Sequence, residues 1–316
     1  MARRTLPLKT PMLSRRGLIA GAGALPLAAA AVARPARAGA DLMGPGMTRF
    51  NRFTLGEFEV TNLLTNMATQ DNPQEIFGLD VPEADFKAAA KARHLPDTVA
   101  KTFFTPTLVN TGKELVLFDT GEEPIQIIRA LEQAGYFVED VDRVILTHMH
   151  SDHISGLSDE AGPTFPNARY VTGSLEWDAW DDTGDDAFDT FMMPLADLTT
   201  FAADGQEVTT GITAVEAFGH TMGHMAYMVE SAGKALFIGG DFVLHHVWSL
   251  EHPDWPVIFD EDKEAAAQTR KRLLDMLATD GIPFVGYHMP WPGLGFVEKD
   301  KDGGFRYVPA TYQLLV

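Results

Sequence analysis

The sequence predicts a layered α/β fold built as a single domain. After residue 41, short β-rich runs alternate with helical patterns, which is typical of sheets covered by helices. His and Asp residues follow these runs repeatedly, and strand ends are where α/β proteins place their chemistry. No internal repeat, low-complexity tract or Gly/Ser-rich linker divides residues 41–316, so we assign them to one domain.

In the first half of the chain, β-rich runs predict a strand pair within Phe53–Leu64 and single strands at Glu114–Phe118, Arg143–Thr147 and Ala168–Val171. Glu123–Gln133 has a helical pattern that stops before Gly135, a residue common just after helix ends. Ser174–Trp180 predicts a second helix, with Ser174 as its N-cap.

The second half begins with short strands separated by glycine-containing turns, at Val208–Ala217, Met225–Glu230 and Ala235–Ile238. Asp260–Leu277 has the clearest helical pattern, because it is acidic at its start and basic further along, which complements the helix dipole. Ile282–Tyr287 is the last expected core strand, and a histidine follows it directly.

Composition excludes several classes of protein. The 316 residues contain no Cys, which rules out a disulfide framework, a cysteine zinc finger and a thiol nucleophile. The net charge is −19, yet residues 1–38 carry seven basic side chains and no acidic one. The remaining 278 residues, with 18 Lys and Arg against 44 Asp and Glu, carry −26. Such an acidic body repels phosphate backbones, so we expect no nucleic-acid partner.

The basic N-terminus has the pattern of an export signal. Arg15 and Arg16 precede an Ala- and Gly-rich apolar stretch from Leu18 to Val32, and Ala36 with Ala38 offers a small-residue cleavage site, with Ala38 and Ala40 as a second choice. Residues 1–38 therefore predict a twin-arginine (Tat) signal peptide and a periplasmic or secreted protein. The stretch is too short and weakly apolar for a stable membrane anchor; an uncleaved anchor or a chance Arg pair is the alternative.

A dense cluster of potential metal ligands follows the strand expected at Arg143–Thr147. His148, His150, Asp152 and His153 lie within six positions, with a helix expected to open at about Ile154. Two side chains two residues apart leave a strand on the same side, and a tight loop can turn the other two toward the same cavity. Convergence of these groups would be costly without a cation, and imidazole with carboxylate suits Zn, Mn, Fe or Co. A solvated polar loop is the alternative.

Further candidates lie after other short apolar runs. They are His220 and His224, in Gly219-His220-Thr221-Met222-Gly223-His224, Asp241, in Gly239-Gly240-Asp241, and His288, in Gly286-Tyr287-His288. Each has a glycine close by, where the backbone can bend tightly.

Together with Asp119 in Phe118-Asp119-Thr120-Gly121, these motifs resemble those of the metallo-β-lactamase superfamily in type and order. The resemblance implies an αββα sandwich, with the site at one edge between the sheets. Within the superfamily, the chain is most similar to methyl parathion hydrolase and related lactonases. That closer similarity rests on stretches such as Leu108–Gly112, Phe165–Ala168 and Tyr287–Gly295, and covers roughly residues 50–312.

The resemblance implies two divalent ions, with Zn expected first and Mn, Fe or Co as alternatives. His148, His150 and His220 would bind one ion, Asp152, His153 and His288 the other, and Asp241 would bridge them. Asp119 would orient a ligand imidazole rather than bind metal. For His224 two roles stay open, either a similar orienting role or that of a packed, hydrogen-bonded histidine in its turn.

The implied reaction is metal-assisted hydrolysis by a hydroxide that bridges two ions. The acidic body favours small neutral substrates, namely esters, lactones or organophosphate triesters. N-acyl-homoserine lactonase is the first alternative, and a non-catalytic metal- or ligand-binding protein the second. The resemblance leaves a homodimer open. Aromatic side chains could wall an apolar substrate pocket, with Met192 and Met193 beside them; the candidates are Phe103, Phe104, Trp177, Trp180, Phe191 and Trp291.

Overall fold

The computed structural model describes residues 46–181, 183–301 and 303–311. The chain divides into two units, residues 1–46 and 47–316. The predicted signal peptide, residues 1–38, lies outside the described residues. All elements that follow belong to the second unit.

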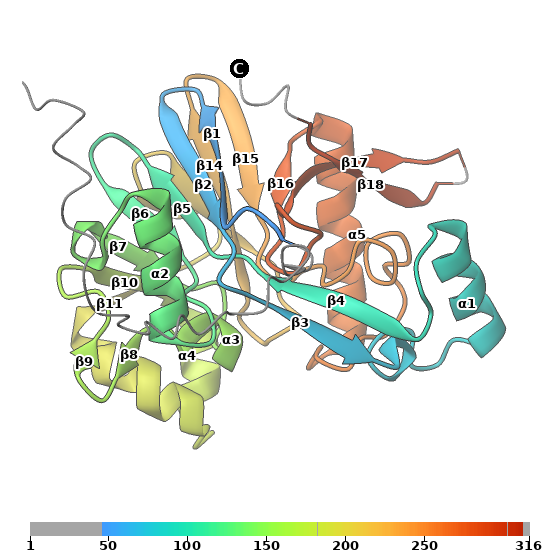
Figure 1. Cartoon of the computed structure of the whole chain (residues 1–316), viewed down its shortest axis with the longest axis horizontal. Coiled ribbons are helices and arrows are strands. Elements are labelled where there is room, and N and C mark those ends of the chain that lie inside the picture. The colour runs from blue at the N-terminus through green and yellow to red at the C-terminus, as the bar shows by residue number, and fades with distance from the viewer. Residues whose placement is uncertain (1–45, 182, 302, 312–316) are drawn as a thin grey trace, which may run out of the picture. The chain divides into compact units, whose positions relative to one another are not determined.

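Two seven-stranded sheets form the centre of this unit (Figure 1). The first has the order β1-β2-β5-β6-β7-β10-β11, made of Phe50–Leu55, Phe58–Leu63, Thr107–Asn110, Leu115–Phe118, Arg143–Ile145, Arg169–Gly173 and Thr199–Ala202. The second runs from β12 to β18 in sequence order, made of Glu207–Thr209, Ile212–Glu216, Met225–Ser231, Lys234–Ile238, Phe284–Val285, Leu294–Lys299 and Phe305–Pro309. Two small sheets pair β3 (Asn66–Asp71) with β4 (Val99–Phe104) and β8 (Ser158–Asp159) with β9 (Gly162–Pro163).

The helices lie mainly outside the sheets. They are α1 (Glu83–Ala92), α2 (Pro124–Ala134), α3 (Ser151–Ile154), α4 (Ser174–Asp181) and α5 (Lys263–Asp280). Short irregular helices occur at Pro73–Glu75, Val138–Asp140, Phe188–Met192 and Met193–Leu198. In Figure 1, α2 lies against the first sheet and α5 against the second.

Three apolar cores separate the four layers. The first joins the outer face of the first sheet to α2, with Leu117 of the sheet and Leu131 of the helix fully buried. The second lies between the sheets, where Val60 and Val109 meet Tyr227 and similar residues. The third joins the second sheet to α5, whose inward face includes Leu273, Leu274 and Leu277. Burial of apolar side chains on both faces of each sheet confirms the predicted αββα sandwich.

Most expected elements are present, with corrections that follow from turns and caps. Val208–Ala217 is a hairpin of β12 and β13 rather than one strand, because the chain reverses at Gly211, where φ is +74°. The strand expected to reach Thr147 ends at Ile145, and the last core strand is only Phe284–Val285. The long helix begins at Lys263 instead of Asp260, because the Asp262 side chain accepts the backbone N–H of Ala265 as its N-cap.

Candidate metal centre

The site lies where loops leave the same edge of both sheets. Parallel pairing of β6 with β7 sets Phe118 beside Ile145, so Asp119 comes next to Thr147. Parallel pairing of β15 with β16 sets Ile238 beside Val285, so the following loops bring Asp241 and His288 together. Because parallel strands end at one edge, residues far apart in sequence converge there.

The loop after β7 carries four of the predicted residues. His150 is the N-cap of α3, so Asp152 and His153 lie in the first turn of that helix. The sequence placed the start of the helix at about Ile154, three residues too late. The helical turn rather than a loop therefore directs these two side chains toward the cavity.

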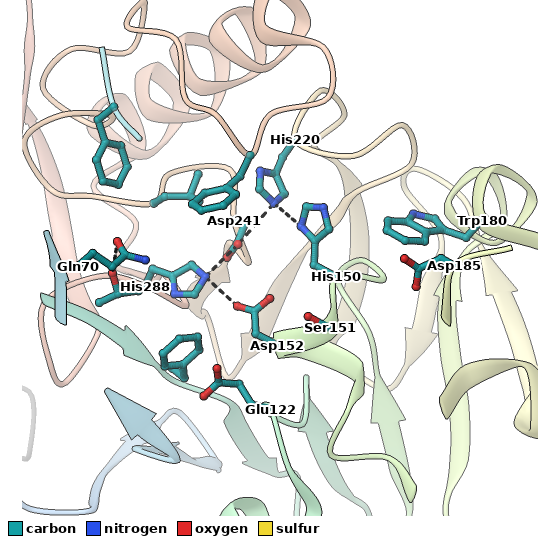
Figure 2. Close-up of a pocket in the computed structure, with 15 residues that line it drawn as sticks. Gln70, Glu122, His150, Ser151, Asp152, Trp180, Asp185, His220, Asp241 and His288 are labelled. Carbon is teal, nitrogen blue, oxygen red and sulfur yellow. Dashed lines mark hydrogen bonds and ion pairs between the residues drawn. The ribbon is translucent and has the colours of Figure 1, made fainter. Parts of the chain in front are cut away.

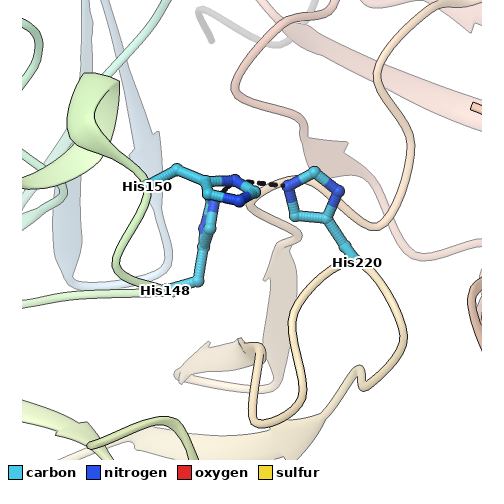
Figure 3. A group of neighbouring side chains, drawn as sticks. All are labelled: His148, His150 and His220. Atoms are coloured by element: carbon cyan, nitrogen blue, oxygen red, sulfur yellow. Dashed lines mark hydrogen bonds between the residues drawn. The ribbon is translucent and has the colours of Figure 1, made fainter. Parts of the chain in front are cut away.

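Three imidazoles form the first group of donor atoms, as Figure 3 shows. His148 Nε2 lies 2.9 Å from His150 Nδ1, and His220 Nε2 lies 3.0 Å from the same atom. His148 and His220 are buried, and His150 is partly exposed. Ring nitrogens this close to one another can bind one cation between them.

Asp152, His153 and His288 form a second group, on the other side of Asp241. His288 Nε2 lies 3.2 Å from Asp152 Oδ2, as Figure 2 shows, and His153 Nε2 lies 3.6 Å from the same oxygen. One oxygen of Asp241 faces both groups. Asp241 Oδ2 lies 3.1 Å from His288, 3.4 Å from His153, 3.5 Å from His220 and 3.9 Å from His148, measured to Nε2 in each case.

The electrostatics differ between the two groups. Burial, with repulsion from neighbouring imidazoles, lowers the pKa of His148 well below its usual value and that of His150 to about 4. Burial alone would also lower the pKa of His288, but the carboxylates of Asp241 and Asp152 raise it to about 10. The same two carboxylates and Asp119 raise the pKa of His153.

Two buried atoms show that the side chains fit divalent ions. Asp241 Oδ1 and His153 Nε2 have no hydrogen-bond partner among the described residues, although unpaired buried polar atoms are costly. Both belong to residues of the donor groups. Imidazole nitrogens with carboxylate oxygens are the donors that Zn and similar metals prefer, so the residues present fit the implied ions.

Outer hydrogen bonds turn the imidazoles toward the centre. Asp119 Oδ2 lies 3.0 Å from His153 Nδ1, and the Phe103 carbonyl accepts from His288 Nδ1 at 2.8 Å. Each bond places the proton on Nδ1 and leaves Nε2 free to bind a cation. Asp119 therefore contacts the imidazole of a predicted ligand, and its orienting role stays a prediction. His224 is buried, and its Nε2 accepts the Asp241 backbone N–H at 3.0 Å, so it contacts the backbone of the site.

Sequence reasoning missed two buried carboxylates at the site. Asp260 Oδ1 lies 3.1 Å from His220 Nδ1, and Asp260 Oδ2 accepts from Arg270 at 2.7 Å. The sequence pattern predicts Asp260 as the start of the helix, and only its position beside His220 reveals its contact with the site. Glu176 accepts hydrogen bonds from Met149 and from the His220 loop, and burial raises its pKa to about 6. No local motif marks either residue.

A pocket of about 400 Å³ opens onto both donor groups. Phe104 and Trp180 line it, as predicted, beside His288 and His150 respectively. Further apolar residues in its wall are Phe77, Leu244 and Phe259. Glu122 and Asp185 lie on different sides of it, as Figure 2 shows, and the residues that line it include no Lys or Arg.

The other aromatic candidates lie elsewhere. Phe103 lines a separate cavity, because neighbouring side chains of β4 alternate between the two faces of the strand. Trp177 and Phe191 pack in the core beneath the first sheet, as do Met192 and Met193. Trp291 lies within a turn in which the Gly293 N–H donates to the Pro290 carbonyl, and its Nε1 donates to Thr48 at 3.3 Å rather than facing the pocket. Proximity to His288 in sequence is a poor guide across such a turn.

Comparison with solved structures supports the fold. AidC, described as a dizinc quorum-quenching lactonase, is 26% identical with a TM-score of 0.76, over 83% of this chain and 97% of that one. The hydrolase AbOPH, described as in the beta-lactamase superfamily, has a TM-score of 0.78 over 84% of this chain and 99% of that one. Its 23% identity shows likeness of fold alone.

Curated relatives match over shorter ranges. Lactamase-like protein nscB of Aspergillus fumigatus is 31% identical over 144 residues, which is 45% of this chain and 38% of that protein. Thioesterase pkgB of Emericella nidulans is 29% identical over 180 residues, which is 56% of this chain and 44% of that protein. The matches thus span less than half the length of these relatives.

The family model of the metallo-beta-lactamase superfamily matches residues 105–309. That range is more than half of the chain. It contains Asp119 and every residue of the two donor groups, from His148 to His288. The chain therefore belongs to the metallo-β-lactamase superfamily.

Proposed function

We propose that this protein is an exported dinuclear metal-dependent hydrolase of small neutral lactones or esters, with organophosphate triesters as a further neutral class. The observation that carries the proposal is the position of Asp241 Oδ2, within 3.9 Å of imidazoles from both donor groups at the base of a pocket. We expect two Zn ions, with Mn, Fe or Co as alternatives. When bound, two such ions supply Lewis acidity and a water that ionises near neutral pH.

The chain's own residues position the substrate and exclude water. Phe104 and Trp180 present apolar faces beside the donor groups, where the apolar part of an ester or lactone can pack. The carboxylates of Asp119 and Asp260 accept hydrogen bonds from Nδ1 of His153 and His220, respectively. Nε2 of each ring therefore points toward the reacting centre. Catalysis then depends on preorganised groups rather than on movement during the reaction.

The charge of the pocket favours neutral substrates. Glu122 and Asp185 belong to neither donor group and place negative charge on the pocket wall, and no basic side chain among the described residues that line it offsets this charge. An anionic substrate, such as an acyl thioester attached to a phosphopantetheine arm, would meet unpaired negative charge. Two of the curated relatives are described as thioesterases. For this pocket, such a thioester is a less suitable substrate than a neutral lactone or ester.

Acyl-homoserine lactones are the first alternative substrates, because AidC, at 26% identity, is described as a quorum-quenching lactonase. These lactones are neutral and carry an apolar chain, so they satisfy the same argument. Rates across a series of acyl chain lengths separate a dedicated lactonase of this kind from a broader esterase. A non-catalytic binding protein is the second alternative.

Removal of metal tests the proposal. Dialysis of the purified protein against a chelator should abolish hydrolysis of neutral aryl esters and lactones, because without the ions no water ionises near neutral pH to act as the nucleophile. Restoring Zn, Mn or Co should recover the rate in proportion to the metal bound, measured by elemental analysis. Hydrolysis that stays independent of metal content would exclude this function, and two bound ions without any hydrolysis would favour the binding protein.

A panel of substrates on the same preparation provides the control for charge. Neutral lactones, aryl esters and phosphotriesters should be turned over, whereas matched substrates carrying a carboxylate or phosphodiester should react more slowly. Faster turnover of the anionic substrates would contradict the argument from the pocket.

Export is a separate part of the proposal. None of the helices in the described part of the chain is long and apolar enough to cross a membrane. Replacing Arg15 and Arg16 by Lys should leave the protein uncleaved in the cytoplasm, because the twin-arginine route requires that pair. Fractionation and immunoblotting measure this. Mature protein in the periplasm of cells expressing the double variant would exclude the route.

A further inference from the structure

Glu176 is a fully buried carboxylate that contacts two different loops of the site. It lies in the first turn of α4, and its exposed fraction is 0%. Its Oε1 accepts the backbone N–H of Met149 at 2.9 Å. Its Oε2 accepts the Thr221 hydroxyl at 2.7 Å and the Gly223 backbone N–H at 3.0 Å. These three hydrogen bonds thus go to the loops that carry His148, His150 and His220.

The loops that Glu176 joins carry the whole first donor group. Met149 lies between His148 and His150, and Thr221 follows His220 directly. These three imidazoles come from opposite sheets of the sandwich, since the first two follow β7 and the third follows β13. Glu176 therefore forms a polar bridge between two segments whose separation sets the distances among the three ring nitrogens.

Backbone packing holds the same two segments in direct contact. A Cβ added at Gly223 would lie 2.0 Å from the backbone nitrogen of Glu176, so the His220 loop rests directly on the start of α4. A Cβ added at Gly173, just before the helix, would lie 2.9 Å from the carbonyl oxygen of Gly223. The hydrogen bonds of Glu176 consequently act at a fixed, close contact rather than across a flexible gap.

The second donor group is supported by other residues. Asp119 bonds to His153, the Phe103 carbonyl accepts from His288, and the Tyr287 hydroxyl donates to the carbonyl of Asp152 at 2.6 Å. None of these supports involves Glu176. Glu176 thus bonds beside the first group alone, whereas Thr147 Oγ1 contacts both groups, His148 Nδ1 at 3.1 Å and His153 Nδ1 at 3.5 Å.

We propose that Glu176 is a positioning residue that sets the metal affinity of the His148, His150 and His220 group while leaving the Asp152, His153 and His288 group nearly unaffected. This inference rests on the proposed two-metal function. It implies that different parts of the chain set the metal affinities of the two donor groups. A residue that merely stabilised the fold would affect both ions alike.

The test is chelator titration of Glu176→Gln in the metal-loaded protein, followed by elemental analysis and by the visible absorption of the Co-substituted form. The amide keeps the shape of the side chain but has one acceptor oxygen, so it cannot accept the backbone N–H groups of both Met149 and Gly223. We expect one ion to dissociate at roughly 10–100-fold lower chelator concentration than in the wild type, and the other to be retained as in the wild type.

Two further variants make the result specific. Glu261→Gln is the matched control, because Glu261 Oε2 accepts from Met222 in the same loop but lies exposed and contacts one loop only. It should bind both ions as the wild type does. Thr221→Val removes one of the three hydrogen bonds to Glu176 at nearly constant side-chain volume. It should weaken the binding of the ion at the first donor group, by a smaller factor than Glu176→Gln. It also keeps the proposal testable if Glu176→Gln fails to fold.

The outcomes separate the two proposals. Wild-type protein that binds fewer than two ions would overturn the dinuclear function itself, whatever the variants do. If the wild type binds two ions, then unchanged affinity in Glu176→Gln and Thr221→Val would overturn the inference. Equal weakening of both ions would overturn it as well, because that result indicates a general structural role.

Discussion

Asp241→Asn is expected to reduce the metal content from two ions to one or fewer per chain and to decrease turnover by more than 100-fold. The substitution keeps the shape of the side chain and removes one negative charge within 3.1–3.9 Å of four imidazole nitrogens. Unit charges about 4 Å apart interact by roughly 4 kcal/mol at an effective dielectric constant of ~20. The loss of this charge therefore weakens the binding of both ions. Changes to residues that only orient a ligand typically cost about 10–100-fold.

Elemental analysis and kinetics on the purified variant measure this effect. Glu122→Gln is the control, because it removes the same charge from the same pocket but belongs to neither donor group. It should retain two ions and near wild-type turnover of neutral substrates. Full occupancy with wild-type turnover in Asp241→Asn would show that the bridge is assigned to the wrong residue.

Arg270→Met is expected to lower the free energy of unfolding by about 3–5 kcal/mol. Arg270 is 1% exposed; it donates to Asp260 at 2.7 Å and to the carbonyls of Pro253 at 2.9 Å and Trp255 at 3.3 Å. Met fills much of the space but leaves the carboxylate of Asp260 buried without its charged partner. Since Asp260 also bonds to His220, the ion of the first donor group should bind more weakly too.

Urea unfolding followed by circular dichroism gives the stability, and the adjacent Lys271→Met provides the control. Lys271 pairs with Asp254 at the surface, where both side chains are largely exposed. Surface pairs contribute between zero and about 1 kcal/mol, so this variant should unfold nearly as the wild type does. Equal stability of the two variants would contradict the role given to the buried pair.

Local sequence patterns were sufficient for most of the fold and for the ligand candidates. Alternating and helical periodicities located the strands around Leu117 and Val144 and the helix that ends before Gly135, because side-chain periodicity reflects burial directly. The closely spaced His148, His150, Asp152 and His153 could be recognised as one cluster, because neighbours in sequence must be neighbours in space. The placement of Asp241 and His288 beside them was anticipated through family resemblance, not from spacing.

The ends of helices and strands were harder to predict, because they depend on single hydrogen bonds rather than on periodicity. The acidic run before the long helix offered three aspartates or glutamates as its start, at positions 260–262. The structure makes Asp262 the N-cap and turns Asp260 inward to His220 and Arg270. A carboxylate near a helix start satisfies the same sequence rule in either role, so the pattern could not distinguish them.

The α/β class and the cluster at His148–His153 could be predicted from local patterns, because both depend on residues a few positions apart. Which distant side chains complete the site became clear only from the packing of the folded chain. Glu176 and Asp260 became recognisable through contacts across 27–47 and 40 positions, and β4 decided that Phe104 faces the pocket while Phe103 does not. A side chain's partners and burial depend on how the layers pack against one another, and that packing is a property of the whole chain.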